Sequence, residues 1–169
     1  MSSDTNTKAG LNTQIFEVYI KAQPEAIWEA ITTPEWTARY GYQGPVEYDL
    51  RPGGAYKARA SKDMLAAGMG IPEVVVDGEV IESDPPRKLV HTYRFLFSPE
   101  MAAEGFTRVT WEIESAGTFS RLTVTHETAN APITAGMIAS KFSLQGSGGW
   151  TWILSDLKSL LETGKTLAG

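Results

Sequence analysis

The chain has no cysteine and only two histidines, His91 and His126, in its 169 residues. The lack of cysteine excludes disulfides, a thiol nucleophile and a cysteine-ligated metal centre. A zinc site would need two or three further ligands within reach of a histidine, and the sequence contains no such cluster. We therefore expect no metal site.

Basic runs and long apolar runs are missing too. The 15 Lys and Arg residues face 20 Asp and Glu residues, for a net charge of -5. A mildly acidic chain without a basic run is poorly suited to nucleic-acid backbones. No stretch is long enough to span a membrane, and the polar N-terminus lacks the apolar core of a signal peptide. We expect a cytoplasmic protein that neither binds nucleic acid nor spans a membrane.

The common motifs of catalysis and phosphate binding are also lacking. No serine lies in a G-x-S-x-G nucleophile elbow. The glycines of residues 146–149 precede a helix, but they lack the lysine and the preceding strand of a phosphate loop. Loop flexibility or close helix packing explains these glycines better, so we expect no bound cofactor.

The last apolar stretch, residues 148–164, has the spacing of an amphipathic helix. Its apolar residues recur at intervals of three and four: Trp150, Ile153, Leu154, Leu157, Leu160 and Leu161. Gly164 follows the run at the position of a C-cap. This is the one long periodic helix in the chain, and its apolar stripe needs a sheet to pack against.

Most of the chain before this helix alternates between apolar and polar residues, as strands do. The alternation predicts strands over residues 14–20, 45–50, 55–60, 74–82, 88–97, 108–114 and 118–127. Prolines ahead of apolar stripes predict two short helices after the first strand, over residues 24–31 and 33–40. The predicted fold is α+β, with a curved antiparallel sheet of about six to seven strands gripping the long C-terminal helix.

Several segments depart from the alternation. Residues 1–12 are small and polar and predict a disordered lead, which leaves a single domain over residues 13–169. Residues 61–72 lack periodicity and suggest a mobile loop, and residues 128–147 form a long connection with one short helix over 134–142. Gly78, inside a strand, predicts a β-bulge.

Five motifs occur in an order that is characteristic of one fold. They are AQPEAIWEAITTPE from Ala22, RPGG from Arg51, GEVIESDPPRKL from Gly78, RLTVTHE from Arg121 and GWTWILSDLKSLLETG from Gly149. With these motifs the chain resembles the SRPBCC superfamily of START-like helix-grip proteins over residues 13–164. The last motif is similar to the C-terminal helix of the branch named after the activator of the heat-shock-protein-90 ATPase.

This resemblance implies a hydrophobic cavity between the sheet and the long helix. Members bind lipids, polyketides, hormones or other apolar molecules, some are cyclases or hydrolases, and the name-giving proteins are co-chaperones. The fold alone does not determine which of these functions a member has.

Aromatic and apolar residues on the predicted inner faces are candidates for lining such a cavity. The predicted ligand-binding set is Trp28, His91, Tyr93, Phe95, Trp111, His126, Met137, Trp150, Leu154 and Leu157. For each aromatic alone, an ordinary core position is the simpler interpretation. Met64, Met69 and Met137 fall in the loops that would rim the cavity. Because Tyr56, Lys57 and Arg59 follow the glycines of the RPGG turn, the pattern does not decide which of them point into the cavity.

His91 and His126 are the candidate catalytic residues. Either could act as a general acid–base or a polar anchor in the cavity. The alternative, which we favour, is a histidine at the edge of the core whose ring is satisfied by a backbone carbonyl.

The leading hypothesis is a binding protein for an apolar or amphipathic small molecule. A cyclase- or hydrolase-like enzyme using His126 or His91 is the second hypothesis. The third is a protein-interaction module with a chaperone as partner, and a homodimer is considered as well. Trp152 points away from the helix stripe, which predicts that it lies beneath residues 128–147 or in a dimer interface.

Overall fold

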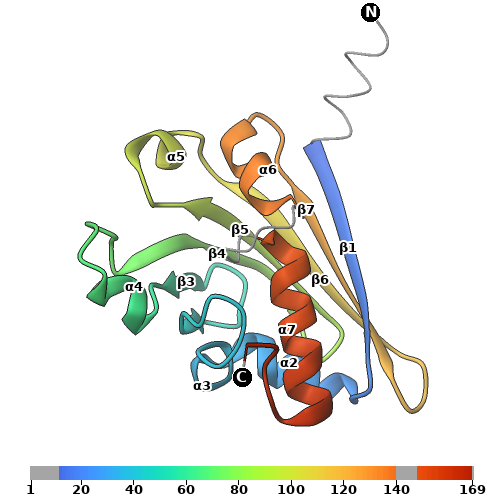
Figure 1. Ribbon diagram of the computed structural model, residues 1–169. Helices are drawn as coiled ribbons and strands as arrows, with labels where there is room; N and C mark the ends of the chain where they lie inside the picture. Colours follow the sequence, from blue (N-terminus) through green and yellow to red (C-terminus); the bar gives the residue numbers. More distant parts are fainter. Residues whose placement is uncertain (1–11, 140–147, 169) are drawn as a thin grey trace, which may run out of the picture.

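A computed structural model describes residues 12–139 and 148–168 of the protein (Figure 1). The lead predicted for residues 1–12 therefore lies, except for Asn12, outside the described residues. The predicted fold class is confirmed: one antiparallel sheet of seven strands holds a long C-terminal helix.

The sheet has the strand order β1-β7-β6-β5-β4-β3-β2, and all neighbouring strands are antiparallel. The strands are β1 (Thr13–Ile20), β2 (Val46–Tyr48), β3 (Ala55–Arg59), β4 (Val74–Asp84), β5 (Lys88–Phe95), β6 (Thr107–Ser115) and β7 (Ser120–Glu127). Burial alternates along the strands as the sequence pattern predicts. In β6, Val109, Trp111 and Ile113 are buried, and the residues between them are half-buried or exposed.

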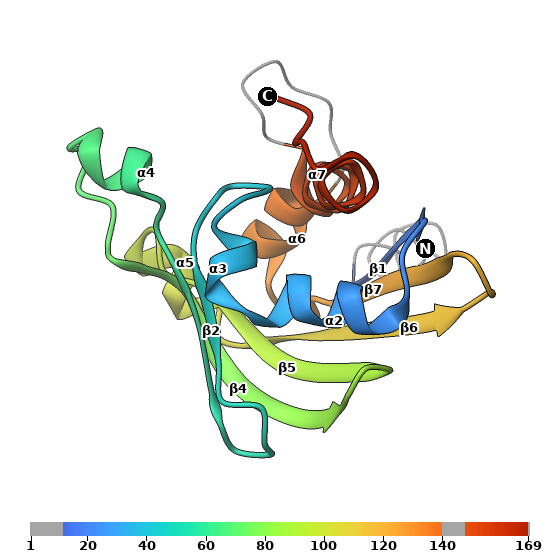
Figure 2. The ribbon, with the colours of Figure 1, turned by 90° about the horizontal axis from the view of Figure 1, so that it is seen from below.

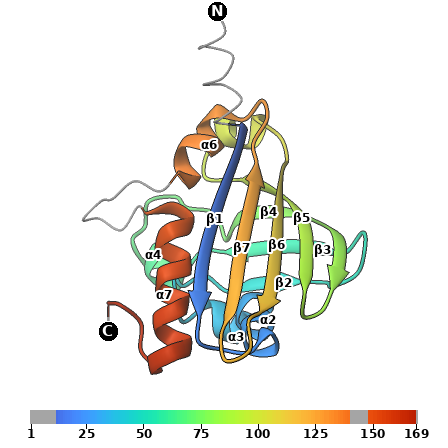
Figure 3. The ribbon, with the colours of Figure 1, turned by 90° about the vertical axis from the view of Figure 1, so that its right-hand side faces the viewer.

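The helices are α2 (Pro24–Thr32), α3 (Pro34–Thr37), α4 (Lys62–Ala66), α5 (Pro99–Ala103), α6 (Pro132–Ile138) and α7 (Gly149–Thr163). Figure 2 shows the sheet bending around α2 and α7, and α7 packs along β1 (Figure 3). In the described part of the chain, none of these helices has the length and hydropathy to cross a membrane.

Helix α7 follows its sequence pattern closely. Trp150, Leu154, Leu157 and Leu160 are buried against the sheet. Gly164 ends the helix in the left-handed conformation, with φ of 80°, and its N–H donates to the carbonyl of Leu160 at 2.9 Å.

Two helices of one turn were not predicted. Residues 61–72 contain α4, where the Ser61 hydroxyl accepts the N–H of Met64 at 3.1 Å as an N-cap. Ser98 caps α5 in the same way. Helices of five residues are too short to show a 3.6-residue period. The short helix predicted over 134–142 is α6, which ends at Ile138, and residues 140–147 lie outside the described range.

The bulge predicted at Gly78 is wrong in its position. The register of β4 against β5 shifts between Val80 and Glu82, and β3 against β4 shifts between Ala58 and Arg59. Gly78 instead permits close approach, because a Cβ atom there would lie 2.0 Å from the carbonyl oxygen of Thr92. A glycine within a strand is compatible with either role.

Gly78→Ala should lower the free energy of unfolding by about 1–3 kcal/mol, because the backbone of β5 must move to admit the methyl group. Gly136→Ala is the matched control. A Cβ at Gly136 meets no atom within 4 Å, and alanine is favoured over glycine in a helix by up to about 1 kcal/mol. Urea unfolding of both variants is the measurement. Equal stability of Gly78→Ala and wild type would contradict the close-approach role.

Candidate functional site

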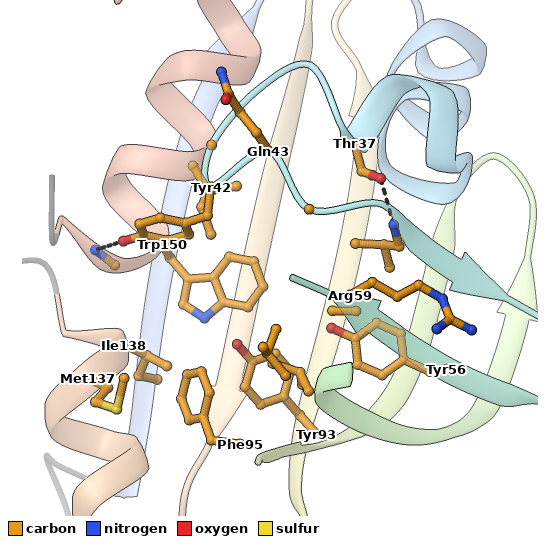
Figure 4. Close-up of a pocket in the computed structure, with 18 of the residues that line it drawn as sticks. Thr37, Tyr42, Gln43, Tyr56, Arg59, Tyr93, Phe95, Met137, Ile138 and Trp150 are labelled. Carbon is orange, nitrogen blue, oxygen red and sulfur yellow. Dashed lines mark hydrogen bonds between the residues drawn. The ribbon is translucent and has the colours of Figure 1, made fainter. Parts of the chain in front are cut away.

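A pocket of about 560 Å³ lies between the concave face of the sheet and the first turns of α7. Strands β2 to β6 supply one wall, and α7, α6 and the connection between α3 and β2 supply the other (Figure 4). Most lining side chains are aliphatic or aromatic. A volume of this size and a lining of this kind suit a drug-sized organic molecule.

The structure brings half of the predicted ligand-binding set together at this pocket. Tyr93, Phe95, Trp111, Met137 and Trp150 all line it. Tyr93 and Phe95 pack edge to face with ring centroids 5.2 Å apart, and Trp111 and Trp150 do so at 5.1 Å. Trp150 therefore joins α7 to the sheet at the inner end of the pocket.

The other half of the set does not line the pocket: Trp28, His91, His126, Leu154 and Leu157. Leu157 is fully buried, and Leu154 lines only a smaller hollow between α7 and β1. Trp28 lies half-buried on α2, packed against the core. His91, His126 and Leu157 lie on the same inward faces as lining residues, but the surrounding core covers their side chains completely. Of the predicted rim methionines, Met64 and Met137 line the pocket, whereas Met69 does not and is 79% exposed.

The connection between α3 and β2 contributes Tyr40, Tyr42 and Gln43 to the pocket, and none of these residues is in the predicted ligand-binding set. This segment has no periodicity, and Gln43 and Gly41 adopt positive φ of 62° and 64°. Gly41 and Gly44 flank Tyr42 and Gln43 in the sequence, and glycines at this spacing indicate a turn. This pattern was the one sequence feature that could have predicted the segment's position.

The outer face of α7 holds this connection in place. Asp156, buried in the helix, accepts the N–H of Gly41 at 2.8 Å and the N–H of Leu167 at 2.7 Å. Trp152 is half-buried, and its indole N–H donates to the carbonyl of Gly41 at 3.3 Å. The location predicted for Trp152, under residues 128–147 or at a dimer interface, did not include this contact. Much of that connection lies outside the described residues.

Each histidine is fully buried and accepts a hydrogen bond from a tryptophan indole. Nε2 of His91 accepts from Trp111 at 3.0 Å, and its Nδ1 lies 2.8 Å from the carbonyl oxygen of Thr92. A carbonyl only accepts, so the network assigns the proton of His91 to Nδ1.

His126 has the opposite tautomer. Its Nδ1 accepts from the indole of Trp150 at 3.0 Å, which leaves the proton on Nε2, 2.8 Å from the hydroxyl oxygen of Thr107. The Thr107 hydroxyl in turn donates to the carbonyl of Tyr93 at 2.8 Å. Every ring nitrogen of the two histidines thus has a partner within the core.

Burial lowers the pKa of His91 to about 4. Burial, with a smaller contribution from the like charge of His91, lowers the pKa of His126 to about 3. Both rings are therefore neutral at physiological pH. This arrangement favours the structural interpretation of the two histidines over the catalytic one.

Apart from Arg59, the described side chains that line the pocket carry no formal charge. Burial raises the pKa values of Tyr48, Tyr56 and Tyr93, so their phenols stay protonated. Arg59 is the one charged lining residue within residues 12–139 and 148–168, and its Nε donates to a carboxylate oxygen of Glu47 at 2.8 Å, at an exposed position. Within residues 12–139 and 148–168 there is no cluster of three or more metal-ligating side chains.

Solved structures with the same fold come from several bacteria. The chain is similar to a protein from Mesorhizobium loti, with a TM-score of 0.64, 20% identity and coverage of 89% of this chain and 96% of that one. It is similar to the Aha1 dimer from Colwellia psychrerythraea, with a TM-score of 0.60, 17% identity and coverage of 90% and 98%. Its similarity to CalU16 from Micromonospora echinospora has a TM-score of 0.51, 20% identity and coverage of 69% of this chain and 60% of that one.

At these identities the similarities establish the fold alone. A comparison with curated proteins gave no match. A family model described as "Activator of Hsp90 ATPase homolog 1-like protein" matches residues 21–162, which is most of the chain. The protein therefore belongs to the family of Activator of Hsp90 ATPase homolog 1-like proteins.

Proposed function

We propose that the protein binds an apolar or amphipathic small molecule in the pocket between α7 and the sheet. The observation that carries this proposal is the pocket of about 560 Å³ with its largely aliphatic and aromatic lining. Burial of ligand surface would contribute about 25 cal/mol per Å² before the costs of ordering the ligand and the side chains around it.

A neutral fluorescent naphthalene, 6-propionyl-2-(dimethylamino)naphthalene, tests the proposal because its emission shifts to the blue in apolar surroundings. We expect saturable, blue-shifted binding to the wild-type protein. Ala58→Trp should weaken this binding at least tenfold, because Ala58 lines the pocket and an indole there occupies ligand volume.

Lys57→Trp is the matched control. Lys57 neighbours Ala58 on β3 and is exposed, so the same side chain enters solvent instead of the pocket. Circular dichroism of each variant checks that it is folded. Unchanged affinity in a folded Ala58→Trp protein, or no binding by wild type, would overturn the proposal.

The enzyme hypothesis has weaker support. It needs His126 or His91 to reach a substrate, yet neither lines the pocket and each ring nitrogen is already hydrogen-bonded. Turnover that is lost in a folded His126→Gln variant would favour it over the binding function.

A chaperone-related role is the second candidate, favoured by the family model and by the likeness to an Aha1 dimer. It requires an exposed docking surface, on this chain or on a homodimer, and does not require the pocket. Stimulation of the Hsp90 ATPase by the purified protein, undiminished in Ala58→Trp, would favour this role over small-molecule binding.

A further inference from the structure

We propose that the hydroxyl groups of Tyr56 and Tyr93 form a paired anchor for a carbonyl-type oxygen, so that the pocket selects neutral ligands with such an acceptor over purely apolar or anionic ones. This inference rests on the proposed binding function and adds the chemical class of the ligand.

The two tyrosines meet across three strands. Tyr56 of β3 is opposite Gly78 of β4, and the register on either side of Gly78 places Tyr93 of β5 across from it. Strands two apart in a sheet are separated by about 9.6 Å. The two rings nevertheless lie with centroids only 6.2 Å apart and nearly parallel. The middle residue of this row is a glycine, which has no side chain to separate the rings.

Both hydroxyls point toward the centre of the pocket (Figure 4). The side chains are otherwise well buried, since Tyr56 is 5% exposed and Tyr93 is 8% exposed. Neither hydroxyl has a hydrogen-bond partner among residues 12–139 and 148–168, whereas the hydroxyl of Tyr40, in the opposite wall, donates to the carbonyl of Ala30 at 2.8 Å. Because both hydroxyls face the open space of the pocket without a protein partner, each is available to a polar atom that a ligand supplies.

The charge of the surroundings determines which polar atom fits. The raised pKa values keep both phenols protonated, so each can donate one hydrogen bond. A carbonyl oxygen has two lone pairs and can accept from both. A carboxylate would lose more hydration on entering, and the guanidinium of Arg59 points away from the two hydroxyls and is engaged by Glu47 (Figure 4).

Three naphthalenes that share a dimethylamino group separate these possibilities: the propionyl ketone, the parent dimethylaminonaphthalene without a carbonyl, and the corresponding naphthoate. Wild type should bind the ketone at least tenfold more tightly than the naphthoate. Tyr56→Phe and Tyr93→Phe remove only a hydroxyl, and each should weaken ketone binding about three- to tenfold. The parent compound should bind all proteins within a factor of two.

Tyr19→Phe is the control, because Tyr19 is an exposed tyrosine of β1 that does not line the pocket, and the loss of its hydroxyl should leave the ratio of ketone to parent unchanged. Infrared spectra give an independent readout, since the C=O stretch of bound ketone should rise when both anchor hydroxyls are removed. Ketone binding that is insensitive to both variants would overturn the anchor while leaving the binding function intact. Tightest binding of the naphthoate would also overturn it and implicate Arg59. Failure of all three probes would instead remove the proposed function itself.

Discussion

Acidification from pH 7.5 to 5 should lower the free energy of unfolding by about 4 kcal/mol, although no carboxylate of ordinary pKa titrates over most of that range. The cause is the pair of buried histidines, with folded pKa values of about 4 and about 3 against 6.5 for the unfolded chain. Above about pH 6.5 the free energy of unfolding keeps its full value, because both histidines are mostly neutral in the folded and the unfolded chain. This stability is lost as the pH falls from 6.5 toward the pKa values of the folded state, because the unfolded state binds protons that the folded state excludes. At pH 5 each histidine accounts for about 2 kcal/mol, from 1.36 kcal/mol per unit over 1.5 units.

Urea unfolding at pH 7.5, 6.5, 5.5 and 5 measures this effect, and proton uptake on unfolding at pH 5 should approach two per chain. His91→Gln provides the control: whatever its effect on stability at pH 7.5, the dependence on pH should fall to about half. These are the only two histidines of the chain, so no third imidazole can replace them. A flat stability between pH 7.5 and 5 would show that one or both rings are accessible to protons in the folded state.

Trp150→Ala should lower the free energy of unfolding by about 3–5 kcal/mol, the range for deleting a buried indole. Trp150 is 5% exposed, packs edge to face on Trp111 and donates to Nδ1 of His126. The substitution therefore creates a cavity and also leaves a buried acceptor without its donor. Urea unfolding at pH 7.5, where both histidines are neutral, measures the loss.

Trp150→Phe separates the two contributions, because it keeps an aromatic ring and removes the N–H. We expect a smaller loss, about 1–3 kcal/mol, for the unsatisfied nitrogen of His126. Freed from its donor, that nitrogen should also accept a proton more readily, so the stability of Trp150→Phe should depend less on pH. If Trp150→Ala unfolds within 1 kcal/mol of wild type, the indole does not join α7 to the sheet as described.

The two histidines support the walls of the pocket and do not line it. Trp111 and Trp150 line the pocket, and behind each of them a neutral imidazole accepts the indole proton. A buried network of this kind stabilises one arrangement of its members when every partner is satisfied. The aromatic walls are thereby held at defined positions before any ligand arrives.

The sequence by itself determined the element types and the inward faces of the longest elements. The stripe of α7, its glycine stop and the alternation of β6 are local patterns, and each follows from the geometry of a helix or strand alone. Elements of one turn, such as α4, escaped prediction because their length is below one or two periods of the pattern.

Only the tertiary structure decided which inward-facing residues line the pocket and which pack against each other in the core. Trp150 and Leu157 share one helix stripe, yet Trp150 lines the pocket and Leu157 is fully buried. The tryptophan partners of His91 and His126 lie 20 and 24 residues away along the chain, and the Tyr56–Tyr93 contact requires a third strand between them. Such contacts depend on the bend of the sheet and on the depth at which α7 packs, and no period in the sequence encodes either quantity.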